Sequence, residues 1–432
     1  MACEDTTEDA PEHDLSEQRS AYCKIFFGGT FLIIILIFTV FSIFWGSLWK
    51  IPVYNLQGWV VDFDGGMVGQ SVVRSFGSNI GASKITWNIV PAQVVGSLDE
   101  LTTLIDLTSQ PVNPGASAKL SAALAVPNSS YDGSEAITAY ATEARNENAF
   151  RGIIRPSVEA SLSAITTSFA MQITQNVANS SVVPALLSTS PQTITSPISY
   201  TINNLLPFDV PVATAATFVG LIYQLLLSFF VVMITLTARE KSGLNDSLSF
   251  RNLILLRFAS SFGAYFFLSL IYSLLNVAFH LPMTRKFGQA GFILFWMLSY
   301  VGMLSVYASS VILSSPANSS LSGLALESFV TLLTVKFIPF FMLMWIITNI
   351  SVCIFPIEVL PRVFRYGYAS PFYNVSRGMR TIVFGTKNEL GLHFGILIVW
   401  IAISCITLPL IQCFVKREGS AKIARPDQDM KV

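Results

Sequence analysis

The sequence is poor in charged residues, and the charges that it has are balanced. Only 12% of its 432 residues are charged and 52% are hydrophobic, whereas soluble domains carry roughly a quarter charged residues. Lysine plus arginine and aspartate plus glutamate number 26 each. Because the two totals cancel, the net charge gives no indication of a nucleic-acid partner, and we expect none. The composition predicts an integral membrane protein.

Cysteine and histidine are also scarce. The five cysteines are Cys3, Cys23, Cys353, Cys405 and Cys413. None lies between residues 50 and 211, so this long polar region is not built on disulfides. His13, His280 and His393 are far apart, and no two cysteines have zinc-ligand spacing. We therefore expect neither a bound metal nor a cofactor.

Motifs for nucleotide and hydrolytic chemistry are missing. The sequence has no G-x-x-x-x-G-K-[ST] phosphate loop, no H-E-x-x-H, no G-x-S-x-G and no C-x-x-C. One pair of carboxylates, Asp62 and Asp64, precedes two glycines. It either holds a divalent cation, as in sugar-nucleotide transferases, or ends a strand in a turn. We favour the turn and predict that the chain is not an enzyme.

Six apolar runs are long enough to cross a membrane. The first, residues 25–48, follows a polar tail (1–24) and lacks an A-x-A cleavage site, so we interpret it as a span rather than a signal peptide. The other runs are 212–236, 252–276, 289–313, 328–352 and 392–415. The predicted inner segments are the two tails (1–24, 416–432) and the 237–251 and 314–327 loops. Taken together they are denser in basic residues than the outer segments, which predicts that both termini are cytosolic. We predict an α-helical polytopic fold with six transmembrane helices.

Residues 49–211 form a predicted extracytoplasmic α+β domain between the first two spans. WVVDFDGG, from Trp59, indicates a strand that ends in a Gly-Gly turn, and KITWNIV, from Lys84, indicates a second strand. Beyond Pro156, apolar residues at steps of three or four predict one face of a long helix, namely Val158, Leu162, Ile165, Phe169, Ile173 and Val177. Five prolines within residues 184–211 predict an extended lead into the second span.

Glycosylation sequons provide a check on this orientation. Asn128-Ser-Ser and Asn179-Ser-Ser lie in the predicted outer domain, where glycans are added in eukaryotes. Asn245 and Asn318 begin sequons in loops that we assign to the cytosol, and these should stay bare.

Ionisable residues within the apolar runs are candidate pathway residues, because burying a charge in a membrane is costly. Arg257 lies close enough to the predicted cytosolic boundary to snorkel. Glu327 begins the fifth run, and Lys336 follows nine residues later, roughly 13.5 Å deeper at the helical rise. Lys336 either lines a translocation path or is a structural lysine bonded to carbonyl groups.

The segment FPIEVLPRVFRYGYASPFYNVSRGMR, residues 355–380, is too polar for a span and too apolar for an ordinary loop. Together with WVVDFDGGMVGQSV, SYDGSEAITAYATEARNENAFRGIIRPSVE and the clustered spans, it makes the chain resemble the fungal nitrosoguanidine-resistance membrane protein family (DUF3533-type). That family is related to ABC-2-type permeases and phage-infection-protein-like proteins. The resemblance implies that the segment is re-entrant on the outer face and caps a pathway. Its marker residues are Pro356, Glu358, Pro361, Pro371 and Arg380.

The resemblance also implies a function. A permease-like protein of this class would export toxic small molecules or metabolites, or confer resistance to them, at the plasma membrane. The alternative is a non-transporting organiser of the membrane, or a regulator of lipid asymmetry or of a partner protein. The implied partners are membrane lipids and an amphipathic small molecule. A homodimer fits the resemblance, and the 237–251 loop could dock a separate ATPase subunit.

Overall fold

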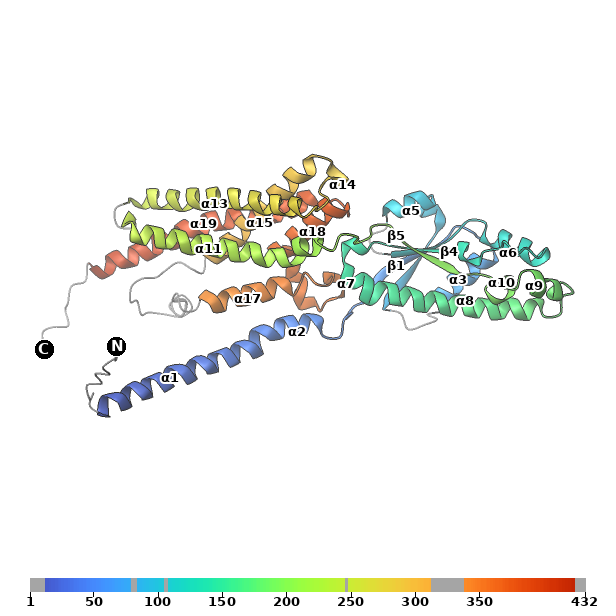
Figure 1. The fold of residues 1–432 in the computed structure, drawn as a ribbon, viewed down its shortest axis with the longest axis horizontal. Coiled ribbons are helices and arrows are strands. Elements are labelled where there is room, and N and C mark those ends of the chain that lie inside the picture. The colour runs from blue at the N-terminus through green and yellow to red at the C-terminus, as the bar shows by residue number, and fades with distance from the viewer. Residues whose placement is uncertain (1–11, 79–83, 105–107, 245–247, 312–337, 424–432) are drawn as a thin grey trace, which may run out of the picture.

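The structure is a computed structural model, and it describes residues 12–78, 84–104, 108–244, 248–311 and 338–423. Figure 1 shows an elongated molecule with two parts. A bundle of long helices forms one end, and the sheet domain (residues 56–204) forms the other. The described ends of α1 (Glu12–Leu36) and α19 (Leu390–Ile423) both lie at the end of the bundle away from the sheet domain.

Long apolar helices make up the bundle. α1 continues through a π-helical turn, Ile37–Phe41, into α2 (Ser42–Leu48). The other large helices are α11 (Gly220–Lys241), α13 (Phe250–Ala278), α15 (Ala290–Val311), α17 (Ile338–Ile350), α18 (Pro371–Phe384) and α19. Within the described residues, four helical stretches are long and apolar enough to cross a membrane, namely Tyr22–Leu48, Ala215–Arg239, Arg251–Ala278 and Leu390–Thr407. The chain is therefore a mostly helical membrane protein.

These four stretches agree with the predicted spans at 25–48, 212–236, 252–276 and 392–415. Helix α15 covers most of the predicted 289–313 run, and Ala290–Val306 is a shorter apolar helix within it. Of the 328–352 run, only the part from residue 338 onward lies within the described residues. The count of six spans stays a prediction.

The sheet domain contains five strands in the order β2-β1-β3-β4-β5. They are β1 (Leu56–Asp62), β2 (Ile85–Val90), β3 (Thr108–Val112), β4 (Ile137–Ala141) and β5 (Tyr200–Asn204). β1 pairs in parallel with β2 and β3, β3 pairs antiparallel with β4, and β4 pairs in parallel with β5. Parallel neighbours need crossover connections. The domain is therefore richer in α/β units than the α+β prediction implied.

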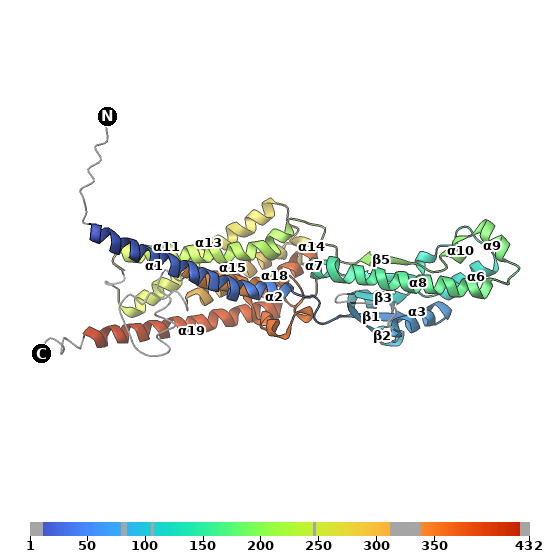
Figure 2. The same cartoon turned by 90° about the horizontal axis from the view of Figure 1, so that it is seen from below.

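Helices connect these strands and cover the sheet. α3 (Met67–Gly77) joins β1 to β2, and α8 (Arg155–Val177) runs along the length of the domain (Figure 2). The predicted apolar face of α8 is buried, since Leu162 and Phe169 share a core with Val60 and other strand residues. The shorter helices are α4 (Ala92–Val95), α5 (Leu98–Leu104), α6 (Ala116–Ala125), α7 (Glu147–Ala149), α9 (Val183–Thr189), α10 (Gln192–Thr195) and, beside the bundle, α14 (Thr284–Phe287).

The lead into the second span differs from the prediction. Residues 184–211 were expected to be extended throughout, but they contain most of α9, all of α10 and strand β5. Pro184 lies in the first turn of α9, and Pro191 directly precedes α10. Proline is tolerated at these positions because the first amides of a helix have no intrahelical partner.

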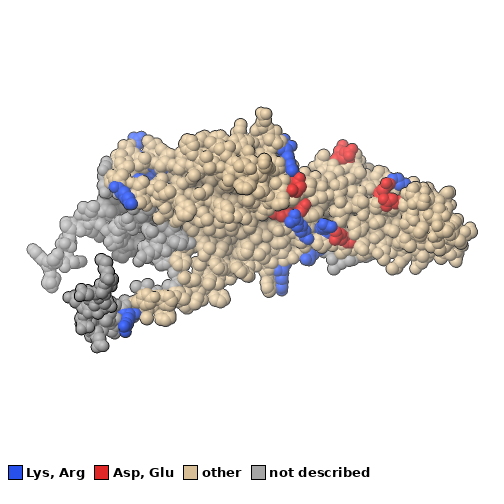
Figure 3. Space-filling model, in the orientation of Figure 1, with Lys and Arg blue, Asp and Glu red and all other residues tan. Residues whose placement is uncertain are grey.

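Charged side chains are unevenly distributed over the surface of the molecule. On the face shown in Figure 3, acidic and basic side chains gather at the two ends of the bundle and on the sheet domain, and the middle of the bundle shows almost none. The exposed side chains of the bundle include large apolar ones such as Phe38, Phe230, Phe267 and Ile398. A belt of apolar surface bounded by charges suits the hydrocarbon core of a bilayer.

Candidate functional site

The segment 355–380 lies where the bundle meets the sheet domain (Figure 1). It forms two 3₁₀ turns, Ile357–Val359 and Arg362–Ala369, and then most of α18. Pro356 and Pro361 directly precede the two turns. The segment is thus folded into short helical pieces rather than the irregular backbone that its prolines suggested.

Helix α18 was missed because it begins at a proline and carries two arginines. Pro371 occupies the first turn, where its fixed φ favours a helix and no hydrogen bond is lost. Gly385 ends the helix with a φ of +75°, a conformation that favours glycine. Almost every residue of α18 is buried. Pro371 therefore begins a helix in the segment that the resemblance marks as re-entrant.

The two charged residues of the predicted motif have opposite environments. Glu358 is exposed, whereas the Arg380 side chain is only 5% exposed. Arg380 Nη1 donates to Glu147 Oε2 at 2.6 Å and to the Ala144 carbonyl oxygen at 3.0 Å. The guanidinium also lies over the ring of Phe208. Because Glu147 belongs to α7, this buried ion pair attaches the sheet domain to the bundle.

Burial and neighbouring charges shift the pKa values of two ionisable groups at this pair. Burial alone would raise the pKa of Glu147, but the charge of Arg380 and its hydrogen bond lower that pKa below its ordinary value. Burial, and then the positive charge of Arg377, lower the pKa of Arg145 to about 10. Glu147 and Arg145 therefore both remain charged at neutral pH.

Further hydrogen bonds surround the ion pair. Arg377 Nη1 donates to the Arg145 carbonyl at 3.2 Å. The side-chain amides of Asn146 and Asn148 both donate to the Ile354 carbonyl, at 3.1 and 3.2 Å. We refer to this set as the joint, made of Ala144, Arg145, Asn146, Glu147, Asn148, Ile354, Arg377 and Arg380.

The remaining polar side chains of α18 bond to the bundle. Ser376 Oγ donates to the Thr217 carbonyl, in the turn that leads into α11, at 2.6 Å. Asn374 Oδ1 lies 2.9 Å from Nδ1 of His393 on α19. Polar groups at membrane depth need such partners because no water is available. α18 therefore connects the bundle helices to one another and to the sheet domain.

A second group of buried polar residues lies inside the bundle, between α11, α13 and α15. The Tyr265 hydroxyl of α13 donates to the Ser228 carbonyl of α11 at 2.9 Å. Trp296 Nε1 of α15 donates to Ser269 Oγ of α13 at 3.1 Å. We name this group the polar seam. It comprises the buried residues Gln224, Ser228, Tyr265, Ser269 and Ser299, and also Tyr272, whose hydroxyl is buried. Buried polar groups in membrane helices serve helix packing or mark a substrate path.

The structure describes one of the three predicted pathway residues. Arg257 is half-buried on α13, eight residues before Tyr265, the nearest residue of the polar seam on that helix, which is roughly 12 Å along the helix. It therefore lies outside the polar seam. Glu327 and Lys336 lie outside the described residues, and their pathway role stays a prediction.

Asp62 and Asp64 organise a turn, as we predicted from the sequence. Asp62 Oδ1 accepts the backbone amides of Asp64 and Gly65, both at 2.9 Å. Asp64 accepts the amide and the hydroxyl of Ser117, at 2.9 and 2.5 Å, and so binds the start of α6. Burial would raise the pKa of Asp64, but these hydrogen bonds lower it. Among the described residues, no three His, Cys, Asp or Glu side chains could hold a metal ion.

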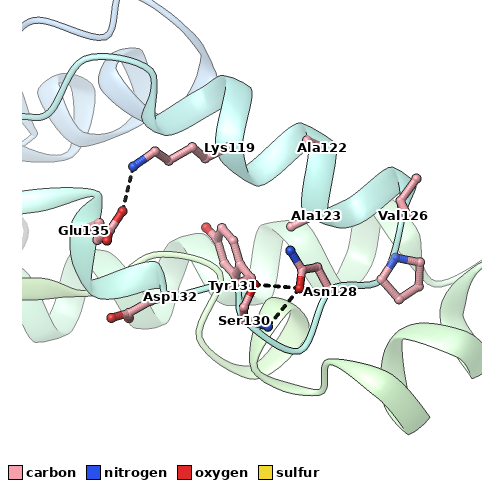
Figure 4. A pocket seen from close by; sticks show the side chains of 10 residues that line it. Lys119, Ala122, Ala123, Val126, Asn128, Ser130, Tyr131, Asp132 and Glu135 are labelled. Carbon is pink, nitrogen blue, oxygen red and sulfur yellow. Dashed lines mark hydrogen bonds and ion pairs between the residues drawn. The ribbon is translucent and has the colours of Figure 1, made fainter.

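A surface cavity of about 510 Å³ lies beside α6 in the sheet domain (Figure 4). Lys119 and Glu135 form an exposed ion pair of 2.6 Å at its edge. Burial, and then the charge of Asp132, raise the pKa of Tyr131 to about 12, so this phenol stays neutral. A phenol with so high a pKa cannot act as a base near neutral pH. We therefore do not place the functional site in this cavity.

The sequons differ in their access to solvent. Asn128, at the edge of this cavity, and Asn179, after α8, are both exposed, as glycan attachment requires. Asn349 and Asn374 also begin sequons, but both are buried. Asn349 Oδ1 accepts the Ser370 hydroxyl at 2.6 Å. A glycan at either buried position would disrupt the packing around α18.

Fold and site together define a helical membrane protein whose sheet domain is fixed to its bundle by a buried ion pair. The chain belongs to a family described as "Protein of unknown function (DUF3533)", whose model matches residues 30–406. It is also similar to the "Uncharacterized endoplasmic reticulum membrane protein YJR015W" of Saccharomyces cerevisiae, with 29% identity over 219 residues. That match covers 50% of this chain and 40% of the yeast protein. No solved structure matches the chain.

The family match confirms the DUF3533 part of the resemblance. The relation to ABC-2-type permeases and the role in nitrosoguanidine resistance stay predictions. Sequence reasoning identified Arg380 but missed its partner Glu147, although Glu147 lies in the ARNENAFRG stretch that carried the resemblance. It also missed the polar seam, because Ser, Tyr and single Gln residues barely change the hydropathy of an apolar run.

Proposed function

We propose that the chain is a permease-like protein that exports amphipathic small molecules or confers resistance to them. The observation that supports this most is the polar seam, in which hydroxyl and amide groups are buried among three apolar helices. Such groups are costly at membrane depth and are retained where they serve packing or transport. In this proposal the bundle has the six spans of an ABC-2-type permease. The segment 355–380 caps the pathway, and α18 transmits movement between the sheet domain and the bundle.

The proposal includes a plasma-membrane location with both termini in the cytosol. The yeast relative is named as an endoplasmic reticulum protein, so location needs a direct test. A fluorescent protein fused to the C-terminus should outline the cell surface. A ring around the nucleus would instead assign the export function to the endoplasmic reticulum.

The energy source in this proposal is a separate ATPase subunit or a substrate gradient. The sequence has no phosphate-binding loop of its own. The full chain should therefore be purified from native membranes, and the co-purifying proteins identified by mass spectrometry. Recovery of an ATPase subunit would favour driven export, and recovery of a second copy of the chain would favour a homodimer.

Transport itself can be tested in liposomes. Rhodamine 6G is an amphipathic fluorophore whose positive charge slows its passage across a protein-free bilayer. Liposomes that contain the purified full chain should release it down a gradient faster than protein-free liposomes. Equal release from both would overturn the permease proposal.

A second candidate function is the organisation of membrane lipids. The joint favours it, because it fixes the sheet domain on the bundle and so presents that domain in a defined orientation at the membrane. The same liposomes can carry a fluorescent phosphatidylcholine whose exposure to dithionite reports lipid exchange between leaflets. Lipid exchange without release of rhodamine 6G would support this candidate.

A further inference from the structure

Among the residues that the structure describes, three polar atoms of the polar seam are buried without a hydrogen-bond partner. They are Gln224 Nε2, the Tyr272 hydroxyl and the Ser299 hydroxyl. Gln224 is 3% exposed and Ser299 is 0% exposed, so water does not reach them from the surface. Other buried hydroxyls of these helices are satisfied: Ser228 Oγ donates to the Gln224 carbonyl at 2.8 Å, and Ser305 Oγ to the Gly302 carbonyl at 2.8 Å. The contrast needs an explanation, because unpaired buried polar groups are rare.

Tyr272 brings two of these groups together. Its ring stacks on Phe295 of α15, with 6.3 Å between the ring centroids. Its hydroxyl lies against Gly220, where a Cβ atom would clash with it, and beside the side-chain amides of Asn276 and Gln224. The absence of a side chain at Gly220 therefore leaves the Tyr272 hydroxyl room between α11 and α13.

Helix α15 adds the third group. Ser299 follows Phe295 by one helical turn, so both lie on the same face of α15. Gly302, about one turn further, faces α11, because a Cβ atom built there would lie 3.6 Å from Gln224 Oε1. The position of Ser299 between Phe295 and Gly302 therefore places its hydroxyl at the level of Tyr272 and Gln224.

This cluster also lies next to α18. A Cβ atom at Gly302 would be only 2.9 Å from a methyl group of Val375. Gln224 follows the start of the helical stretch at Ala215 by nine residues, which is roughly 13 Å along the helix. The cluster therefore lies in the half of the bundle near the sheet domain.

We propose that Gln224, Tyr272 and Ser299 form an intramembrane binding site for an uncharged hydrogen-bond acceptor, such as a ketone, ester or amide carbonyl, on an apolar body. The three side chains offer amide and hydroxyl donors and no charge, and the rings of Tyr272 and Phe295 supply an apolar wall. A carbonyl oxygen is the group that such donors satisfy. This inference rests on the proposed permease function and specifies the chemical class of its substrate.

Benzophenone is a suitable probe, because it carries one carbonyl between two phenyl rings and forms covalent adducts under ultraviolet light. The purified full chain in detergent would be irradiated with it, and the labelled peptides identified by mass spectrometry. We expect adducts on α11, α13 and α15 around the three residues. Diphenylmethane has a similar shape but no carbonyl, and should compete only weakly. Adducts scattered over the lipid-facing surface alone would overturn the site.

Two variants and a matched control separate binding from structure. Gln224→Leu combined with Ser299→Ala should lower labelling about tenfold, the change that a lost hydrogen bond or two produces in an equilibrium. Ser305→Ala removes a buried hydroxyl from the same helix, but one that already has a partner, and should leave labelling unchanged. Ser299→Ala should not lower the Tm, because it removes no hydrogen bond. A lower Tm with unchanged labelling would show a structural role and overturn the proposal.

The source of the carbonyl can be tested in the same assay. Dioleoylphosphatidylcholine carries ester carbonyls, so suppression of labelling when it is added supports a lipid as occupant. Labelling that persists in its presence supports a small molecule. Release of rhodamine 6G without benzophenone labelling at the cluster would overturn this site but leave the permease function standing. Labelling without release would overturn the function but leave the site.

Discussion

The joint and the polar seam handle buried polar groups in opposite ways. In the joint, two full charges, Arg380 and Glu147, are buried, and each has its partner at 2.6 Å. The side chains of the polar seam are uncharged, yet Gln224, Tyr272 and Ser299 each leave a polar atom without a partner among the described residues. The charged groups, which cost more free energy to bury, thus have partners, whereas these neutral polar groups, which cost less, do not.

This difference separates a structural site from a binding site. A buried ion pair contributes little net stability compared with apolar residues, but it specifies which surfaces meet. An unpaired amide or hydroxyl costs stability without specifying anything, unless another molecule supplies the missing partner. The joint therefore fixes the sheet domain, whereas the polar seam contains buried membrane-helix groups that lack a hydrogen-bond partner among the described residues.

Breaking the joint should have the largest effect on stability. Arg380→Met leaves the Glu147 carboxylate buried without a counter-charge, which costs about 3–5 kcal/mol. Thermal unfolding of the full chain in detergent would measure the drop in Tm. Arg377→Met is the matched control on the same helix, because Arg377 donates to the neutral Arg145 carbonyl and lies over the Tyr373 ring, so its loss leaves no buried carboxylate behind and should cost less. Equal losses would show that the ion pair has no special role.

Replacing both partners sharpens the same comparison. Arg380→Met combined with Glu147→Leu leaves no buried charge, so the Tm should recover most of the single-variant loss. Crosslinking between introduced cysteines in the sheet domain and the bundle would report whether the domain keeps its orientation. A double variant as unstable as Arg380→Met would mean that Glu147 is not the group left unpaired.

Acid should weaken the joint selectively. The pKa of Glu147 is lowered from its ordinary value of 4.5, so its carboxylate contributes stability above that pH and loses it as the pH falls through the lower folded pKa. The Tm of the unmodified chain should fall on acidification below about pH 4.5. Asp64 and Asp209 also have lowered pKa values, so the readout is the difference from the double variant, which lacks this carboxylate. Identical pH profiles would contradict the prediction.

Features of the fold that depend on residues close together in the sequence could be predicted, and features that depend on contacts between distant segments could not. The spans and the buried face of α8 follow from local patterns, because long apolar runs and steps of three or four are visible within one segment. The turn at Asp62 and Asp64 was also predictable, since Asp and Gly favour turns by local chemistry. Helix α18 was not, because its prolines and arginines suggest a loop until the surrounding helices are known.

The candidate sites depend on contacts between distant segments. Arg380 and Glu147 are separated by 233 residues, and no local pattern relates them. The polar seam combines three helices whose Ser, Tyr and Gln residues are each compatible with an apolar run. The structure is needed to show that these residues lie together. It is also needed to show that the Ser228 hydroxyl has a hydrogen-bond partner and that the Ser299 hydroxyl has none among the described residues.

Weakening the turn at Asp64 should lower the stability by an intermediate amount. Asp64→Asn weakens the charged hydrogen bonds to Ser117 and should cost roughly 1–3 kcal/mol in unfolding free energy. Asp132→Asn is a suitable control, because Asp132 accepts hydrogen bonds only from the adjacent Ser134 among the contacts described. Added Mg²⁺ should leave the Tm of the unmodified chain unchanged. A rise that disappears in Asp64→Asn would instead support the cation interpretation of this pair.

The smallest loss of stability should come from breaking the ion pair between Arg285 and Asp209. This pair has two hydrogen bonds, but it is exposed to solvent. Arg285 donates two hydrogen bonds to Asp209, both at 2.9 Å, and the two side chains are 39% and 45% exposed. Solvent screens both charges before and after the bond is lost, so Arg285→Met should cost no more than about 1 kcal/mol. Salt should reduce this cost further, whereas the cost of Arg380→Met should barely depend on salt. If Arg285→Met destabilised the chain as much as Arg380→Met, burial would not be what distinguishes the joint, and its role in fixing the sheet domain would have to be shared with α14.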